Sequence, residues 1–270
     1  MPELPEVETT CRGIEPYLLN KTIKSIIVRH RGLRWPIPKN LEKELAGQRI
    51  KQIARRGKYI LITVKTGTLI VHLGMSGSLR RVKCSEQAEK HDHFEIVLGQ
   101  HCIRYRDPRR FGAVLFTIDD PLQHKLLKDL GPEPLDKTFN GQYLFERSRN
   151  RKVSIKQFIM DSKIVVGVGN IYASESLFYA GINPNRAAGQ INLERYQQLA
   201  KSIKKVLRAA IKQGGTSLKD FIKTDGQPGY FKQKLAVYGR EGEPCIQCGK
   251  PLKHLVQGQR ASYYCSHCQK

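Results

Sequence analysis

The spacing of apolar residues near the N-terminus is that of a helix. Apolar side chains recur every three or four positions, which places them on one helical face: Val7, Cys11, Ile14 and Leu18. Pro5 suits an early helical position, because its fixed φ angle is already close to that of a helix. The pattern therefore predicts a first helix from about Pro5 to Leu19.

Between residues 22 and 118 the pattern changes to short apolar runs rich in Val, Ile, Leu and aromatic residues. Turn-forming pairs such as Thr66-Gly67 and Gly99-Gln100 separate the runs. Strands are predicted over Thr22–Arg29, Tyr59–Val64, Leu69–Leu73, Phe94–Leu98, Cys102–Tyr105 and Ala113–Phe116. These strands favour an α+β protein whose N-terminal part is a β-sandwich flanked by helices.

The second half of the chain has a helical pattern. It follows Gly131–Asp136, a stiff, turn-rich stretch typical of an interdomain linker. Helices are predicted over Ser154–Met160, Tyr172–Tyr179 and Leu193–Gln213. Asn192 suits the N-cap of the last helix and Gly214 its C-cap. The basic residues of this helix lie largely off its apolar face, and we interpret them as solvated, with phosphate contact as the alternative: Lys201, Lys204, Lys205, Arg208 and Lys212.

The chain carries a large excess of positive charge. Its 270 residues include 47 Lys and Arg against 24 Asp and Glu, a formal net charge of +23. A nucleic acid is the expected partner, and a ribosome-like or merely soluble basic surface is the alternative. No apolar run approaches the roughly 18 to 20 residues that span a bilayer, and Met1–Thr10 lacks the pattern of a signal peptide. We therefore expect a cytoplasmic protein without membrane association.

Four of the seven cysteines form two C-x-x-C pairs near the C-terminus: Cys245, Cys248, Cys265 and Cys268. The spacing C-x2-C-x16-C-x2-C brings four thiolates around one tetrahedral Zn2+ and leaves no open position. It predicts one structural zinc ion that holds a hairpin over Ile246–Tyr264. Cys11, Cys84 and Cys102 have no such partners and are expected to be small, buried packing residues.

Two weaker motifs suggest other chemistry. Residues 244–248 match the PCxxC of zinc deaminases, and His93-Phe94-Glu95 supplies an HxE. That HxE lies far along the chain in a predicted strand, and the second C-x-x-C completes the metal shell without a histidine. Gly167-Val168-Gly169 begins like a dinucleotide fingerprint, but Tyr172 stands where the third glycine belongs. A tight turn between helices is the preferred interpretation.

A series of short motifs runs through the chain in order: residues 1–8 (MPELPEVE), Gly57-Lys58-Tyr59, His72–Gly77, Asp107–Gly112, Gly167–Tyr172 and the cysteine array. Together they resemble bacterial formamidopyrimidine-DNA glycosylase. The resemblance implies a bifunctional glycosylase and AP lyase that removes 8-oxoguanine and ring-opened formamidopyrimidines from double-stranded DNA. It also implies a helix-two-turn-helix in the helical half, followed by a zinc-finger hairpin.

The resemblance assigns the chemistry to the N-terminus. The α-amine of Pro2, exposed when the initiator methionine is removed, would attack deoxyribose C1′ and leave an iminium that permits strand cleavage. Part of an α-amine is neutral at pH 7, because its reference pKa is about 7.7 to 8.0. Glu3 would donate and accept protons around the sugar, with Glu6 in support. Lys58 would assist β-elimination and Arg260 δ-elimination, although plain phosphate contact is an alternative for both.

The same resemblance implies contacts with the DNA outside the reaction centre. Asn170 and Lys152 match positions that hold the DNA backbone, and His91 matches a DNA-contacting position. To reach C1′, the enzyme must flip the nucleotide out of the duplex, which leaves a hole in the base stack.

Three side chains match the family's wedge for that hole. Met75 and Phe111 would supply apolar surface against the neighbouring bases, and Arg109 would hydrogen-bond the orphaned cytosine. The glycine-rich segment Gly215–Phe231 is expected to be a lid over the flipped base.

These features predict a catalytic β-sandwich domain over residues 1–131, a helical DNA-binding domain over 136–240 and a zinc finger over 241–270. We expect a monomer without an obligate protein partner, in the bacterial cytoplasm and associated with the nucleoid. Two alternatives stay open. One is the endonuclease VIII type for oxidised pyrimidines, against which the Glu-Leu after Pro2 and the intact Pro108–Gly112 argue. The other is a non-catalytic, zinc-containing DNA-binding protein.

Overall fold

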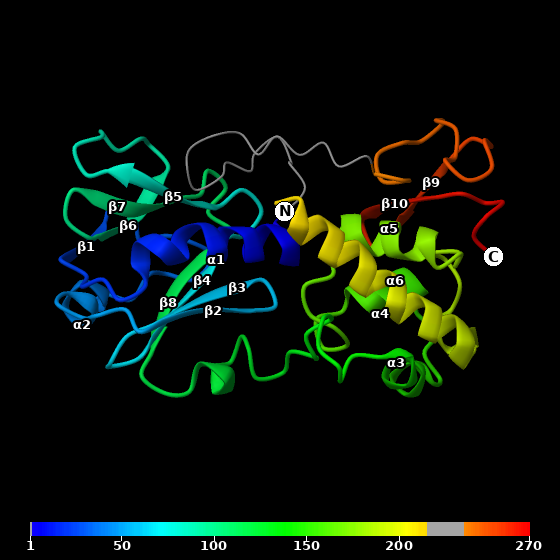
Figure 1. Cartoon of the computed structure of the whole chain (residues 1–270), viewed down its shortest axis with the longest axis horizontal. Helices are drawn as coiled ribbons and strands as arrows, with labels where there is room; N and C mark the ends of the chain where they lie inside the picture. Colours follow the sequence, from blue (N-terminus) through cyan, green and yellow to red (C-terminus); the bar gives the residue numbers. More distant parts are fainter. Residues whose placement is uncertain (1, 215–234) are drawn as a thin grey trace. The chain divides into compact units, whose positions relative to one another are not determined.

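The computed structural model describes residues 2–214 and 235–270, which divide into two compact units (Figure 1). Residues 2–129 form the N-terminal unit, and residues 130–213 and 235–270 form the C-terminal unit. Met1 and the expected lid, Gly215–Phe231, lie outside the described residues. Among the described helices, none is long and apolar enough to cross a membrane.

The N-terminal unit combines one long helix with two antiparallel sheets of four strands each. One sheet has the order β1-β6-β7-β5, with β1 Ser25–Val28, β6 Asp92–Val97, β7 His101–Arg106 and β5 Ser78–Lys83. The other has the order β2-β3-β4-β8, with β2 Gln52–Arg56, β3 Tyr59–Thr63, β4 Thr68–His72 and β8 Ala113–Thr117. The helical segments of the unit are the long helix α1 Leu4–Leu18, the short helix α2 Leu41–Leu45 and the 3-10 turn η1 Pro121–Gln123.

Both sheets and α1 share one apolar core. Ile60 and Ile62 of β3 pack in the same buried cluster as Phe94 and Ile96 of β6 and Ile14 of α1. Complete burial of each such side chain is worth about 1.5 to 3 kcal/mol. α1 contacts β2, β3 and β5, so the core holds this helix against the sandwich (Figure 1, blue). The residues immediately before its first turn are thereby positioned as well.

The structure confirms the predicted first helix and the predicted strands, and it adds further elements, among them two strands and a short helix. The helix runs over Leu4–Leu18, one residue earlier than expected. The pattern missed β2, β5 and the short helix α2. β2 and β5 are edge strands that contain consecutive arginines. Edge strands are half exposed and so lack a continuous apolar pattern.

The expected burial of the unpaired cysteines is partly wrong. Cys11 and Cys102 are buried, but Cys84 is exposed. Cys84 follows the end of β5, where its backbone amide donates to Gln100 O at 2.8 Å. Position in a surface turn, rather than residue type, decides its exposure.

The C-terminal unit is mainly helical. Its elements are α3 Gly141–Ser148, α4 Ile155–Met160, α5 Asn170–Tyr179, η2 Ala188–Gln190, α6 Leu193–Lys212, β9 Lys253–Gln257 and β10 Arg260–Tyr264. α3 and α5 both pack against α6. The Asn192 side chain caps α6 by accepting the Arg195 amide at 3.0 Å. After the helix Gly214 has a φ of +83°, a conformation that favours glycine.

Three further expectations for this unit can be compared with the structure. Gly167 has a φ of +82° in the turn between α4 and α5, which confirms a tight turn there. β9 and β10 pair as an antiparallel hairpin within the predicted zinc segment. The pattern missed α3, an eight-residue helix whose first turn is capped by the Asn140 side chain.

Candidate active site and zinc centre

The four C-terminal cysteines meet at one point. Their Sγ atoms all lie within 4.8 Å of one another, with 3.9 Å between Cys245 and Cys268 and 3.5 Å between Cys248 and Cys265. A tetrahedral Zn2+ with bonds of about 2.3 Å places its sulfur ligands about 3.8 Å apart. The thiolates therefore fit one zinc ion with a closed coordination shell, and the ion is structural.

The deaminase interpretation finds no support in the described residues. His93 and Glu95 lie in β6, and the cysteine cluster contains no histidine. Glu95 is bound by two guanidinium groups, that of Arg104 at 2.6 Å and that of Arg29 at 2.7 Å. A carboxylate held in this way is part of a buried ion-pair network rather than a general acid or base.

The N-terminus of α1 forms a compact buried group. Pro2, Glu3 and Glu6 are all buried. The Glu3 amide donates to Glu6 Oε2 at 2.8 Å, and the Glu3 side chain accepts the Glu6 amide in a capping box. Pro2 is thus held immediately before the first helical turn, where the helix dipole disfavours a positive charge.

Lys58 and His72 lie close together on the second sheet. Lys58 is in the turn between β2 and β3, and the next residue, Tyr59, pairs with His72 of β4. His72 Nδ1 accepts the Gly74 amide at 3.0 Å. Burial, together with the positive charges of Lys58 and Arg34, lowers the pKa of His72 to about 4. His72 is therefore a neutral imidazole whose proton lies on Nε2.

Two neighbouring loops carry the three expected wedge residues. We name residues 73–77 the first wedge loop and residues 107–112 the second wedge loop. The first follows β4 and the second precedes β8, and the pairing of His72 with Ala113 places the two side by side. Met75 is 38% exposed and Phe111 45% exposed. The Arg109 guanidinium lies 4.8 Å from the centre of the Phe111 ring. The loops thus present apolar surface and a cation to solvent.

His91 lies at the base of the second wedge loop. It is half-buried in the turn before β6. Its carbonyl accepts the Asp107 amide at 3.1 Å, and its ring lies 6.3 Å from that of His93. His91 is thereby placed beside the wedge within the N-terminal unit.

Asn170 begins α5 in the C-terminal unit. Its side-chain amide donates to the Tyr238 hydroxyl at 3.2 Å, while its Oδ1 is buried without a hydrogen-bond partner among the described residues. Glu175, also on α5, accepts the backbone amides of Ala236, Val237 and Tyr238 at 2.8 to 3.0 Å. Burial raises the pKa of Glu175, and the three amide hydrogen bonds oppose that shift. This carboxylate holds Tyr238 beside the helix N-terminus, a ready anion site.

Arg260 occupies the tip of the zinc hairpin. It is exposed at the first position of β10. Behind it, the buried Lys156 of α4 donates to Ala261 O at 2.7 Å and to Ser262 Oγ at 2.8 Å. The hairpin is therefore tied to α4 next to Arg260. Lys152, by contrast, is exposed in the segment before α4.

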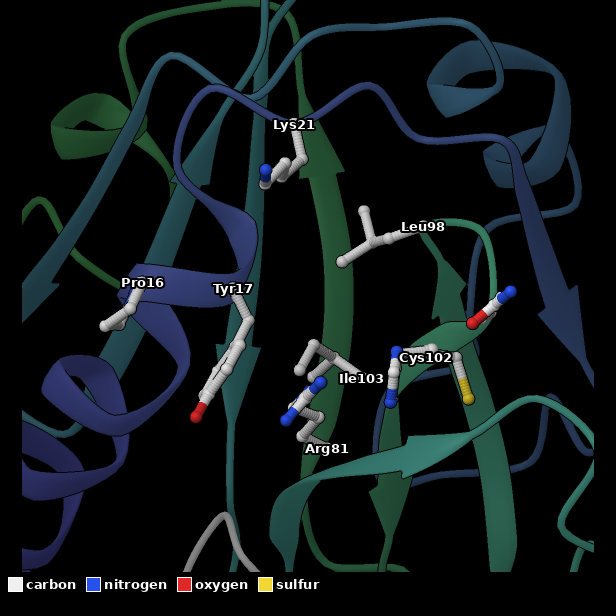
Figure 2. Close-up of a pocket in the computed structure, with 9 residues that line it drawn as sticks. Pro16, Tyr17, Lys21, Arg81, Leu98, Cys102 and Ile103 are labelled. Carbon is white, nitrogen blue, oxygen red and sulfur yellow. The ribbon is translucent and has the colours of Figure 1, made fainter.

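A separate pocket of about 340 Å3 lies at the other end of α1 (Figure 2). Tyr17 and Arg81 face each other there, with the guanidinium 4.4 Å from the ring centre. Lys21 also lines this pocket, but none of the expected site residues does. Since α1 has 15 residues, this pocket is about 22 Å from Pro2. It is not the candidate active site.

Comparison with known proteins covers nearly the whole chain. The family model for the formamidopyrimidine-DNA glycosylase N-terminal domain matches residues 1–114, and the model for the H2TH domain of the same family matches residues 130–222. A model described as the zinc finger found in FPG and IleRS matches residues 242–270. The chain belongs to the formamidopyrimidine-DNA glycosylase family. The resemblance inferred from the sequence motifs is thereby confirmed.

Relatives within the family align over their full length. A formamidopyrimidine-DNA glycosylase of Stutzerimonas stutzeri is 57% identical over 272 residues, with all of both chains covered. Two solved structures of Lactococcus lactis Fpg, each with a TM-score of 0.91 and full coverage of both chains, are 33% and 34% identical. The first is a complex with DNA containing N7-benzyl-Fapy-dG, and the second a complex with DNA containing an oxidised pyrimidine. The α+β fold with a zinc-finger hairpin is therefore that of the family.

Sequence reasoning missed several side chains that the structure singles out. His72 stands in the quoted motif His72–Gly77, but the pattern did not show its neutral state. Glu175 is the one charged residue of α5, and that anomaly was the available signal. Tyr238 and Lys156 had no such signal, because their partners are far away in the sequence.

Proposed function

We propose that this protein excises oxidised purines from duplex DNA and then cleaves the strand, with the Pro2 amine as nucleophile. Family membership supports a base excision repair glycosylase with AP lyase activity that contains one structural zinc ion. The observation that carries the proposal for the nucleophile is the buried capping box, which fixes Pro2, Glu3 and Glu6 at the start of α1. The proposal requires removal of Met1, which lies outside the described residues, because an acylated nitrogen cannot form an iminium.

The reaction would begin with the neutral amine of Pro2. Its lone pair attacks C1′ and the bond from C1′ to the base breaks, and the departing base takes up the proton that the attacking nitrogen loses. Glu3 then protonates O4′ as the C1′–O4′ bond opens. An iminium between Pro2 and C1′ results, which acidifies the C2′ proton. Removal of that proton expels the 3′ phosphate, a second elimination expels the 5′ phosphate, and water releases the sugar remnant.

Cationic and polar groups would hold the strand during these steps. Lys58 and Arg260 are proposed to assist β- and δ-elimination, because a cation that binds a phosphate also stabilises its departure. Asn170 at the N-terminus of α5 is proposed to bind a backbone phosphate, because N–H donors and the positive end of the helix dipole favour an anion at that position. Lys152 and His91 are proposed as further DNA contacts. Since Lys152 is exposed and His91 half-buried, both are accessible for that role.

The exposed side chains of the wedge loops suit a flipped-base complex. Met75 and Phe111 would fill the hole in the stack, and Arg109 would bind the orphaned cytosine. Exposure of two large apolar side chains on adjacent loops is unfavourable in water and supports this role.

The wider organisation is also proposed. Residues 1–131 would supply the catalytic domain, residues 136–240 the helical DNA-binding domain and residues 241–270 the zinc finger. The protein would act as a monomer in the bacterial cytoplasm, close to the nucleoid, with damaged double-stranded DNA as its partner and no obligate protein partner.

A second substrate class deserves direct measurement. The complex of Lactococcus lactis Fpg with DNA containing an oxidised pyrimidine favours some acceptance of such lesions in the family. We expect faster excision of 8-oxoguanine opposite cytosine than of thymine glycol in matched duplexes. Faster excision of thymine glycol would instead support the endonuclease VIII type of activity.

Borohydride trapping tests the proposed nucleophile. Reduction of the iminium should join the protein covalently to lesion-containing DNA, and the Pro2→Gly variant or a protein that retains Met1 should lose the adduct. Binding of the same duplex by each variant serves as the control. Binding without any adduct in the unmodified protein would remove the mechanism and leave the non-catalytic alternative.

A further inference from the structure

A buried carboxylate and a hydroxyl connect the two wedge loops. Asp107 is 0% exposed. Its Oδ1 accepts the Ser76 hydroxyl at 2.7 Å, and its Oδ2 accepts the Gly112 amide at 2.8 Å. Ser76 Oγ accepts the Arg109 amide at 3.2 Å. Ser76 belongs to the first wedge loop and the others to the second, so Ser76 makes two of its hydrogen bonds across the gap between the loops.

The two loops also touch through their backbones. Gly74 has a φ of +62°, and a Cβ added there would lie 2.5 Å from the Gly112 nitrogen. A Cβ added at Gly112 would lie 1.8 Å from the Tyr105 hydroxyl oxygen. That hydroxyl is 3.3 Å from Asp107 Oδ2. Because no side chain separates the loops here, a shift of either loop must displace the other.

The side chains at the tips of the wedge loops depend on this contact between the loops for their position. Met75 and Phe111 are exposed, so few contacts of their own hold them in place before DNA binds. If each loop moved independently, only a fraction of the protein would have both tips correctly placed, and the apparent affinity for the flipped state would fall by that fraction. A hydrogen bond between the loops restricts them before binding.

We propose that Ser76 is a positioning residue for base flipping. Its hydroxyl, oriented by Asp107, couples the two wedge loops so that Met75, Arg109 and Phe111 enter the duplex as one preorganised unit. The inference rests on the proposed function of these three side chains as the wedge. It adds a residue that does not itself have to touch the DNA.

Comparison of two substrates tests this coupling. One is a duplex with 8-oxoguanine opposite cytosine, which must be opened, and the other is a single-stranded oligonucleotide with an abasic site, which has no stack to invade. Ser76→Ala removes the hydroxyl and leaves both Asp107 Oδ1 and the Arg109 amide without it. Its single-turnover rate on the duplex should fall by roughly tenfold or more, the effect of losing a hydrogen bond to a charged group. Cleavage of the single strand should change by less than about twofold, and Ser76→Thr should restore the duplex rate.

A double-mutant cycle with Met75→Ala distinguishes failure of the proposed coupling through Ser76 from failure of the proposed wedge. If Ser76 acts through the wedge, Ser76→Ala should cost much less in the Met75→Ala background than in the unmodified protein. An equal loss in both backgrounds, an equal loss on both substrates, or an unchanged duplex rate for Ser76→Ala overturns the coupling. If Met75→Ala itself leaves the duplex rate unchanged, the proposed wedge fails, and the coupling fails with it.

Discussion

Replacement of His72 by asparagine should make the N-terminal unit less sensitive to acid. His72 accepts the Gly74 amide at Nδ1, 3.0 Å away, and the Oδ1 of asparagine can take the same position. The substitution thus keeps an acceptor for the amide but removes a titrating group. Burial, followed by the positive charges of Lys58 and Arg34, lowers the pKa of His72 from 6.5 to about 4.

The size of the effect follows from this shift. Between pH 6.5 and 4 the unfolded chain binds a proton at His72 and the folded protein does not, so stability falls as the pH decreases through that window. The stability that the neutral His72 contributes is fully present above pH 6.5. From pH 7 to pH 5 the loss from this group alone is about 2 kcal/mol, and it approaches about 3 kcal/mol below pH 4.

Urea unfolding monitored by tryptophan fluorescence measures this contribution. Trp35 is the sole tryptophan of the chain and lies in the N-terminal unit, so it reports on that unit. The free energy of unfolding of His72→Asn should decrease by about 2 kcal/mol less than that of the unmodified protein between pH 7 and pH 5. Above pH 7 the unfolding free energy of both proteins should change with pH at the same rate, and this agreement is the internal control. Parallel plots of unfolding free energy against pH for the two proteins between pH 7 and pH 5 would refute the assignment of a neutral His72.

Three further outcomes are expected. Removal of zinc by a chelator should abolish binding to lesion-containing DNA while the Trp35 fluorescence of the N-terminal unit stays native, and full binding by the metal-free protein would contradict a structural role for the ion. Lys156→Met should destabilise the C-terminal unit by about 2 kcal/mol, because Ala261 O and Ser262 Oγ lose a charged donor, and calorimetry with an unchanged melting temperature would argue against it. Gly74→Ala combines a left-handed φ with a backbone clash, so it should destabilise the N-terminal unit by at least about 2 kcal/mol in urea unfolding, and a neutral result would show that the wedge loops are not in contact.

The local pattern of the sequence was sufficient to predict those elements in which one physical signal dominates. The apolar stripe of the first helix, the short apolar runs of the central strands and the capping residue Asn192 are local features, and the structure confirms each of them. The spacing of the two C-x-x-C pairs likewise predicts zinc directly, because the thiolate geometry of the metal leaves few other arrangements.

The motifs identified the family, and the structure then placed their residues. Met75 and Phe111 belong to separate motifs of the sequence, and only the family resemblance relates them there. The pairing of β4 with β8 brings their loops side by side. The edge strands β2 and β5 were not predicted, because exposure on one side lets arginine interrupt the apolar run there.

Tertiary structure alone decided the properties that depend on partners distant in the chain. The neutral state of His72 comes from burial beside Lys58, and the tie between the wedge loops comes from one carboxylate, Asp107, and the hydroxyl of Ser76, 31 residues before it. The exposure of Cys84 depends on its place in a turn. Burial, charge proximity and hydrogen bonding are sums over neighbours in space, and the sequence orders neighbours along the chain only. Residue types and spacings therefore determined the family and the metal, whereas the charge states and the rigidity of the site were set by folding.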